Sequence, residues 1–281
     1  MTAPAVKKVA ARIAFLGPKG TFSQAAVQQH FGGDAQLLEC ASIDDVFAAV
    51  AAGSAEYGVV PVENSTEGAI NNTQDCLIES RLFIVGEEIV QIEHNLMVQP
   101  GGSRQQIHTI ASHKQSLAQC RRWLQVNFPS ISQRECASNA EAAKLALADP
   151  SVAAIAGAIA ADTYGLEILE RAIQDQHHNS TRFLVLANAR TESTGRDKTS
   201  ILVYTENKPG ALFRVLEPFE SMQISLTKIE TRPSKKEAWE YVFFIDFEGH
   251  RNDPVVQRLF EKLATCTAEV KLLGSYPMAR R

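Results

Sequence analysis

Apolar residues in the first two thirds of the chain form short runs that alternate with longer stretches of helical spacing. Between the runs, apolar positions three and four residues apart predict helices, one beginning near Phe22 and another after Ser42. Ser138, followed by Glu141, is a capping-box pattern that predicts the start of a further helix. Strands alternating with helices predict an α/β domain. The short runs predict strands at 12–16, 57–62, 107–111, 131–136, 152–156 and 182–186.

The pattern changes after residues 188–198, a polar segment without apolar periodicity that we interpret as a linker. Beyond it, the predicted order of elements is β-α-β-β-α-β, which is ferredoxin-like and fits one small domain. The sequence therefore predicts two domains, at residues 11–188 and 199–277. The elements of the second are strands at 199–204, 225–231, 241–247 and 268–273 and helices at 209–219 and 254–264.

Composition narrows the range of functions. The length of 281 residues agrees with two domains, at roughly 150 residues per domain. A net charge of −4 without a basic face argues against nucleic acid as a partner. The five cysteines lie far apart without a C-x-x-C pair, and the histidines show no metal-binding spacing, so we expect no disulfide framework and no metal site.

The chain shows no signal for secretion or for a membrane. Met1–Lys8 lacks the apolar core of a signal peptide. The most apolar stretch, Val152–Ala161, is too short to cross a bilayer, which takes ~20 apolar residues. We therefore expect a cytoplasmic protein with no membrane partner.

Two polar segments follow predicted strands in the first half of the chain. Residues 17–23 (GPKGTFS) join a strand to a helix, and a glycine turn there gives an anion access to the unpaired N–H groups of the helix. Residues 61–68 (PVENSTEG) bring acid, amide and hydroxyl groups to a strand end, where open α/β sheets bind ligands. Each segment has a plainer interpretation, a structural turn for the first and a helix cap for the second.

Two further segments have the same character. Residues 112–120 (SHKQSLAQC) place Ser112 near the start of a helix and Gln119 about two turns later. In residues 179–183 (NSTRF), Arg182 is able to clamp a carboxylate and Thr181 to donate a hydrogen bond or a proton. A turn entering a strand explains the same residues without any site, so the local pattern leaves both interpretations open.

Taken together and in this order, the segments resemble those of the prephenate dehydratase family. The resemblance runs from residue 12 to about 277. It implies a catalytic domain of two lobes, like a periplasmic binding protein, with the active site in the cleft between them. Lys114 stands where the family often has Pro. The matching segments are Gly17-x-x-Gly-Thr-Phe-Ser23, Pro61-Val-Glu-Asn-Ser65, Ser112-His-x-Gln115 with Gln119, Asn179-x-Thr-Arg-Phe183, Asn207-Lys-Pro-Gly-Ala-Leu212 and Thr227-Lys-Ile-Glu-Thr-Arg-Pro233.

The implied activity is that of a carbon–oxygen lyase, which converts prephenate to phenylpyruvate in L-phenylalanine biosynthesis. Loss of CO₂ and water makes the ring aromatic, so the enzyme has to orient the dianion and assist the departing hydroxyl, and no cofactor is implied. The catalytic residues implied by the resemblance are Thr181, Glu63, Asn64, Ser112 and Gln119. The substrate-binding residues that it implies are Thr21, Ser23, Ser65, Arg182 and Phe183.

The C-terminal domain resembles an ACT domain, which implies an allosteric site for L-phenylalanine as a feedback inhibitor. Ser225 stands where Asn is usual, and Thr231 stands where Ser is usual. ACT domains of this family pair across subunits, which implies a homodimer, or a tetramer made of two dimers. The implied effector-binding residues are Gly210, Ala211, Leu212, Ser225, Glu230, Thr231, Arg232 and Pro233.

Two other functions remain compatible with the sequence. Arogenate dehydratase, or an enzyme that accepts both substrates, shares these motifs and differs in tolerating an amino group on the substrate. A two-lobed solute-binding protein without catalysis would share the lobes, but residues 181–183 (TRF) and the ACT resemblance disfavour it. No chorismate mutase helix bundle precedes residue 12, so we expect a monofunctional enzyme.

Overall fold

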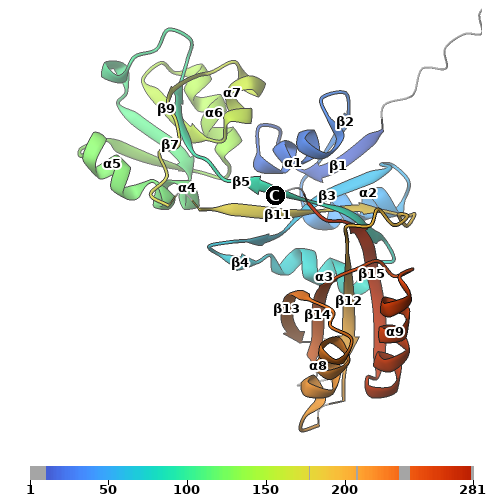
Figure 1. Ribbon diagram of the computed structural model, residues 1–281. Coiled ribbons are helices and arrows are strands. Elements are labelled where there is room, and N and C mark those ends of the chain that lie inside the picture. The colour runs from blue at the N-terminus through green and yellow to red at the C-terminus, as the bar shows by residue number, and fades with distance from the viewer. Residues whose placement is uncertain (1–10, 177, 207, 234–240, 280–281) are drawn as a thin grey trace, which may run out of the picture. The chain divides into compact units, whose positions relative to one another are not determined.

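The computed structural model describes residues 11–176, 178–206, 208–233 and 241–279 (Figure 1). Met1–Lys8 and Asn207, which the sequence analysis used, lie outside the described residues. The chain divides into two compact units. The first contains residues 11–73 and 88–183, and the second contains residues 74–87 and those from 184 onward. The α/β class expected from the sequence is confirmed.

The first lobe of the first unit is built on a mixed sheet. Its strands are β1 Arg12–Leu16, β2 Gln36–Cys40, β3 Tyr57–Asn64, β4 Gly68–Ala69, β5 Phe83–Gln91 and β11 Ser180–Ala187. The strand order is β2-β1-β3-β11-β5, with β1 parallel to β2 and to β3, and the short β4 pairs antiparallel with β3. Its helices are α1 Phe22–Phe31, α2 Ile43–Ala51 and α3 Asn71–Glu79. Residues 74–79 of α3, 83–87 of β5 and 184–187 of β11 belong to the second unit.

The predicted start of α2 after Ser42 is confirmed. The Ser42 hydroxyl accepts a hydrogen bond from Asp45 N at 3.1 Å, and the Asp45 carboxylate accepts one from Ser42 N at 3.1 Å. Each partner satisfies an N–H group that the first turn of a helix leaves without an intrahelical acceptor. The Asp44 and Asp45 carboxylates also lie at the positive end of the helix dipole.

The second lobe has its own five-stranded sheet, in the order β10-β6-β9-β7-β8. The central strand β9 is buried along its whole length because side chains on its two faces enter two different cores. Ala154 packs among the helices on one face, and Ile155 packs on the other. The elements are β6 Asn95–Val98, β7 Thr109–His113, β8 Ser132–Cys136, β9 Val152–Ala156, β10 Glu167–Glu170, α4 Lys114–Gln119, α5 Arg121–Asn127, α6 Asn139–Ala148, α7 Ala158–Tyr164 and the 3₁₀ turn Arg104–Gln106.

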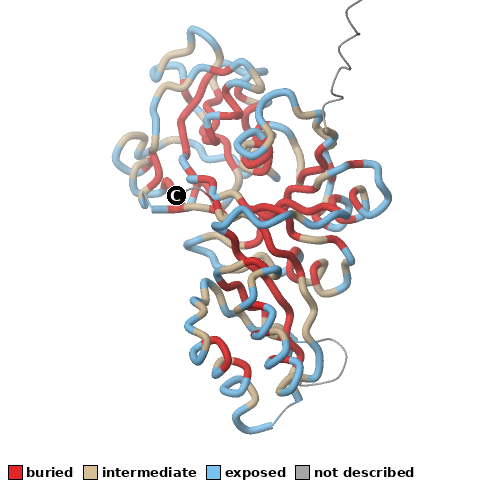
Figure 2. The backbone as a smooth tube through the Cα atoms, turned by 45° about the vertical axis from the view of Figure 1, so that its right-hand side comes forward, coloured by how far each residue is buried: buried red, intermediate tan, exposed pale blue. Residues whose placement is uncertain are grey.

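The second unit confirms the predicted β-α-β-β-α-β order. Its antiparallel sheet has the order β13-β14-β12-β15, and both helices cover one face, where they bury Ile201, Ile245 and Phe247. Figure 2 shows buried backbone along the central strands and exposure on the outer faces of the helices. The elements are β12 Asp197–Tyr204, α8 Ala211–Ser221, β13 Leu226–Pro233, β14 Tyr241–Glu248, α9 Pro254–Cys266 and β15 Glu269–Pro277.

Residues 74–87 are fixed to strands of the second unit by charged side chains. The Lys198 ammonium lies 2.8 Å from the buried Glu87 carboxylate, which also accepts a hydrogen bond from Ala279 N. Arg232 pairs with Asp75 at 2.8 Å. Lys271 donates to three backbone carbonyls at the end of α3, which satisfies acceptors that a helix C-terminus leaves unpaired.

We expect Lys198→Met to lower the free energy of unfolding by about 3–5 kcal/mol, because it leaves the Glu87 carboxylate buried without its cation. Urea unfolding followed by circular dichroism measures the loss. The matched control is Lys19→Met, which removes a cation from the exposed Lys19–Glu39 pair and should cost about 1 kcal/mol or less. Equal effects of the two substitutions would contradict the importance of the buried pair.

Candidate active site

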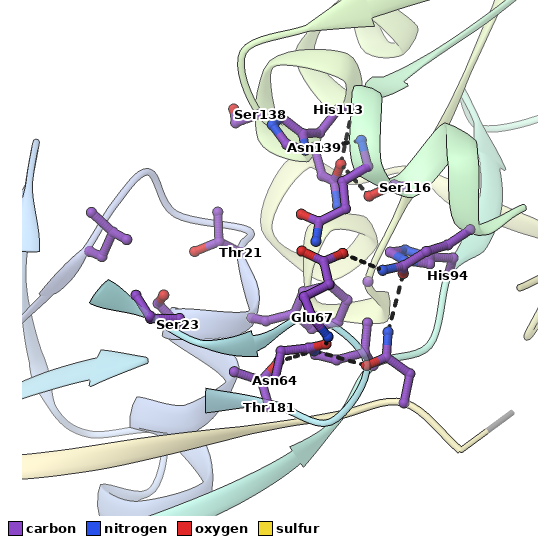
Figure 3. A pocket seen from close by; sticks show the side chains of 18 of the residues that line it. Thr21, Ser23, Asn64, Glu67, His94, His113, Ser116, Ser138, Asn139 and Thr181 are labelled. Atoms are coloured by element: carbon purple, nitrogen blue, oxygen red, sulfur yellow. Dashed lines mark hydrogen bonds between the residues drawn. The ribbon is translucent and has the colours of Figure 1, made fainter. Parts of the chain in front are cut away.

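A cleft of about 480 Å³ lies between the two lobes of the first unit. The first lobe contributes the turn before α1 and the loop that joins β3 to β4. The second lobe contributes the starts of α4 and α6, and the segments that connect the lobes contribute His94, Asn179 and Thr181. Figure 3 shows these side chains converging from both lobes. The cleft is therefore built from parts of the chain that the sequence analysis singled out, residues 179–183 included, and from His94, which it did not.

Asn64, at the end of β3, ties the loop after it to β11. Its side-chain oxygen accepts hydrogen bonds from Thr66 N at 3.0 Å, from the Thr66 hydroxyl at 2.6 Å and from Glu67 N at 3.1 Å. Its nitrogen donates to Asn179 Oδ1 at 2.8 Å and to Thr181 Oγ1 at 2.9 Å. Because Thr181 Oγ1 is the acceptor from Asn64, the hydroxyl hydrogen of Thr181 is left to be donated elsewhere.

Gln119, at the end of α4, joins this group to the second lobe. Its oxygen lies 2.7 Å from His94 Nε2 and accepts from Asn179 Nδ2 at 3.2 Å, and its nitrogen donates to Glu67 Oε1 at 3.3 Å. The oxygen of Gln119 can only accept, so the hydrogen of the His94 ring is on Nε2. Burial lowers the pKa of His94, and the hydrogen bond with Gln119 opposes that shift. The ring is therefore neutral at neutral pH.

Asn139, the first residue of α6, organises the opposite wall. Its side-chain oxygen accepts from the Ser116 hydroxyl at 3.0 Å and from His113 N at 3.1 Å. It also lies 3.0 Å from the Ser112 hydroxyl, whose one hydrogen has a closer acceptor in the carbonyl oxygen of Ile155 at 2.6 Å. Ser138 precedes it and accepts from Glu141 N, as predicted, but the Glu141 carboxylate accepts from Ala137 N and not from Ser138 N. The predicted capping box is thus present in its first half only.

The lining suits an anion although none of the described residues in it is a lysine or arginine. Two helices of eight or more residues, α1 in one lobe and α6 in the other, begin at the cleft. Helix N-termini present unpaired N–H groups and the positive end of the helix dipole. Thr21, at the start of α1, directs its hydroxyl to Pro18 O and does not cap the helix, so the N–H groups of that turn stay available. Glu67 is the sole carboxylate in this lining.

The lobes meet at two glycines beside the cleft. A Cβ atom on Gly20 would lie 2.6 Å from Cε2 of Tyr164, and one on Gly157 would lie 2.8 Å from Cε1 of Phe22. The Tyr164 hydroxyl donates to the carbonyl oxygen of Lys19 at 2.8 Å. Gly20 also has a φ of +81°, in the region that favours glycine. A side chain at either position would force the facing aromatic ring to move.

Five of the site residues implied by the resemblance line this cleft: Thr21, Ser23, Asn64, Gln119 and Thr181. Ser112 is fully buried and reaches the cleft through Asn139. Ser65 is exposed and bonds to the backbone of His178 and Ser180. Glu63 and Arg182 are outside the lining, and Phe183 lies in the core. The sequence analysis included Asn179 in the segment 179–183 without giving it a role. It did not single out His94 or Asn139, because nothing near them in sequence signals a site.

The effector-binding residues implied for the second unit fall in two separate places. Gly210, Ala211 and Leu212 start α8, beside a cavity that Ala211 lines and residues 230–233 do not. Glu230 and Arg232 point to the same side of the edge strand β13, where they pair with Lys228 and Asp75. Thr231 and Pro233 alternate with them along β13, and Ser225 precedes that strand and accepts a hydrogen bond from Glu248 N through its carbonyl oxygen.

Two searches concern only the described part of the chain. No three of its His, Cys, Asp and Glu side chains are grouped so as to hold a metal ion. Within the same residues, no helix combines the length and apolar character needed to span a membrane.

Comparisons with known proteins agree on one family. The family model described as prephenate dehydratase matches residues 13–191, and the ACT domain model matches residues 199–265. A bifunctional chorismate mutase/prephenate dehydratase of Stutzerimonas stutzeri is 49% identical over 268 residues, which cover 95% of this chain and 73% of the relative.

Two solved structures are similar over the same span. The prephenate dehydratase of Arthrobacter aurescens in complex with L-Phe has 35% identity and a TM-score of 0.85, and the match covers 95% of this chain and 89% of the other. GqqA, described as a novel type of quorum quenching acylase, has 29% identity and a TM-score of 0.86 over 95% and 98% of the two chains.

The buried, neutral His94 predicts a contribution to the pH dependence of stability. The unfolded chain binds a proton on this residue below about pH 6.5, whereas the folded chain resists it. The stability that the neutral His94 contributes to the folded state is therefore fully present above that pH. It declines as the pH falls, by at most about 1.4 kcal/mol of unfolding free energy per pH unit. We expect His94→Gln to lose less stability than the wild type between pH 7.5 and 5.5 in urea unfolding. Parallel losses would contradict this account.

Proposed function

Because the chain belongs to the prephenate dehydratase family, we propose that it converts prephenate to phenylpyruvate, CO₂ and water in the cleft of its first unit. The observation that carries this proposal is the hydrogen-bonded group of Thr181, Asn64 and Gln119 in an anion-compatible cleft. Prephenate has two carboxylates and a hydroxyl leaving group, and the reaction forms an aromatic ring. The protein has to hold the dianion in one orientation and assist the departure of the hydroxyl.

The carboxylates of the substrate would be held by neutral donors. The starts of α1 and α6 face the cleft from opposite lobes, so each can receive one negatively charged group. Thr21, Ser23 and Ser116 add hydroxyls, and Asn139 adds an amide. Because these N–H and O–H groups lie in both lobes, binding of the two carboxylates would also fix the orientation of the substrate ring in the cleft.

Thr181 would act on the leaving hydroxyl. Its hydrogen is directed away from Asn64, which already donates to its oxygen, so Thr181 is set to donate to an oxygen atom of the substrate. Asn64 and Gln119 would position it, and Ser112 would act through Asn139. Within this proposal Glu63, Ser65, Arg182 and Phe183 contribute by holding β3 and β11, on which they lie or which they adjoin.

We further propose that the second unit senses L-phenylalanine and forms a dimer interface. Support comes from β13, an edge strand that in the described residues pairs with β14 alone, and from two exposed apolar side chains, one on α8 and one on β13. Phe213 is 71% exposed and Ile229 is 42% exposed, which favours a partner surface. Effector residues that lie apart in one chain would meet across such an interface: Gly210, Ala211 and Leu212 from one subunit, and Ser225, Glu230, Thr231, Arg232 and Pro233 from the other.

The proposed domain limits, 11–188 and 199–277, have structural support, since β11 ends at Ala187 and β12 begins at Asp197. A cytoplasmic location is supported by the cysteines, because no disulfide joins any of the five, all of which lie in the described residues.

The test of the proposed function is turnover of prephenate and of arogenate, each with and without L-phenylalanine. We expect formation of phenylpyruvate from prephenate, with saturation kinetics, and a lower rate when L-phenylalanine is present. Faster turnover of arogenate would transfer the assignment to the sister activity. Absence of turnover with either compound would contradict the proposal. Inhibition by L-phenylalanine without binding of L-phenylalanine to the second unit would contradict the sensing role of that unit.

Thr181→Ala should lower kcat by about 100-fold or more, because it removes the hydroxyl that assists the leaving group. Thr181→Ser keeps that hydroxyl and is the matched control, with kcat expected within about tenfold of the wild type. Steady-state rates with prephenate at neutral pH measure both. A Thr181→Ala enzyme with nearly normal kcat would show that Thr181 takes no part in the chemical step.

A further inference from the structure

Glu67 is a carboxylate in a cleft that has to receive a dianion. It lies in the turn between β3 and β4, and its side chain points into the cleft between the Asn64–Thr181 pair and the wall formed by Ser116 and Asn139 (Figure 3). Two like charges in one site repel each other, so an unprotonated Glu67 would oppose substrate binding. A group that costs binding energy at this position calls for a role in the reaction.

The surroundings of Glu67 do not neutralise it. Gln119 Nε2, an uncharged donor, lies 3.3 Å from its Oε1. His94 and His113 line the cleft with it, and Arg122 and Asp175 line the pocket next to it. No ion pair within 4 Å joins Glu67 to any of these among the described residues, and Asp175 is occupied by the backbone N–H groups of Arg122 and Trp123.

The proposed reaction needs a proton, because the hydroxyl has to leave as water. Three groups other than Glu67 come near enough to be considered. Thr181 is an alcohol and a weak acid. Burial lowers the pKa of His94, and its Nε2 hydrogen is engaged by Gln119. His113 accepts a hydrogen bond from Gln115 N through Nδ1, which places its ring hydrogen on Nε2, and a neutral imidazole is a weaker acid than a carboxylic acid.

We propose that Glu67 is the general acid of the reaction, an inference that rests on the proposed function. Its carboxyl group lies in the cleft lining beside Gln119 and is the proton donor of the step. As the C–O bond breaks, Glu67 gives its proton to the departing oxygen, which leaves as water. The C–C bond to the ring carboxylate breaks at the same stage, its electron pair enters the ring, and CO₂ leaves. Glu67 is then a carboxylate and takes a proton from solvent, to which it is exposed.

The other residues then have distinct roles. Thr181 donates a hydrogen bond to the same leaving oxygen and fixes its place, while Glu67 supplies the proton. Asn64 connects the two, since it donates to Thr181 Oγ1 and accepts from Glu67 N. Gln119 holds the carboxyl group through Oε1, and His94 fixes which way the Gln119 amide faces.

The test compares Glu67→Gln and Glu67→Asp with a control, Glu93→Gln, which changes an exposed carboxylate outside the cleft lining. We expect Glu67→Gln to lower kcat for prephenate by about 100-fold or more. Its KM should stay unchanged or fall, because the amide removes the charge that opposes the dianion. Glu67→Asp keeps a carboxyl group and should retain a kcat well above that of Glu67→Gln. The control should match the wild type in rate and KM.

The outcomes separate this inference from the function on which it rests. Wild-type turnover of prephenate together with Glu67→Gln turnover within a few fold of it would overturn the role of Glu67 and leave the proposed function intact. If Glu67→Gln lost turnover of arogenate but kept turnover of prephenate, Glu67 would be a ligand for the ammonium group of arogenate. That result would also overturn its role as general acid. A wild type inactive on prephenate would remove both. If the three variants unfold at the same urea concentration as the wild type, a lower rate results from the chemical step and not from loss of folding.

Discussion

The side-chain amide of Asn64 is the interaction on which the arrangement of the cleft depends. Its oxygen accepts from the Thr66 and Glu67 side of the loop, and its nitrogen donates to Asn179 and Thr181. If the amide were reversed, its NH₂ group would face the N–H groups of Thr66 and Glu67, which are also donors. Only one orientation therefore satisfies these groups. Thr181 is 117 positions further along the chain, yet its hydroxyl is held by this amide. The geometry of the proposed leaving-group site is therefore a consequence of one strand end and the loop that follows it.

The choice of neutral donors in the cleft agrees with the chemistry proposed for it. The ring carboxylate of the substrate leaves as uncharged CO₂, so its charge disappears in the course of the reaction. A lysine or arginine against that carboxylate would stabilise the ground state more than the transition state and slow the step. Helix N-termini and amides bind more weakly and are spread over two lobes. This arrangement allows the dianion to be oriented without being trapped.

The sequence predicted the fold where the period of apolar residues was regular. The buried strand β9 and all six elements of the second unit lie within a few residues of their predicted positions, and Ser42 begins α2 as expected. The strands β2, β5, β6 and β10 were not predicted. β2 is a case in point, because its residues are mostly half-buried or exposed at the edge of a sheet, where pairing decides the structure more than apolar periodicity.

The candidate site was predictable in part, for a different physical reason. The end of a strand in an α/β sheet is a common ligand site, which is how the segment of Asn64 could be chosen, whereas Thr181 lies at the start of β11 and was implied by the family resemblance. Whether a side chain faces a cleft or lies behind its wall depends on packing, so Ser112 and Asn139 could not be told apart by sequence.

The lack of lysine and arginine in the lining has a consequence for how substrate arrives. Helix-end dipoles act within about one turn, and the chain carries a net charge of −4, so the described lining of the cleft offers a dianion no long-range attraction. Encounter is then unsteered diffusion against a weak repulsion, and added salt would speed capture slightly where it slows an enzyme with a cationic funnel.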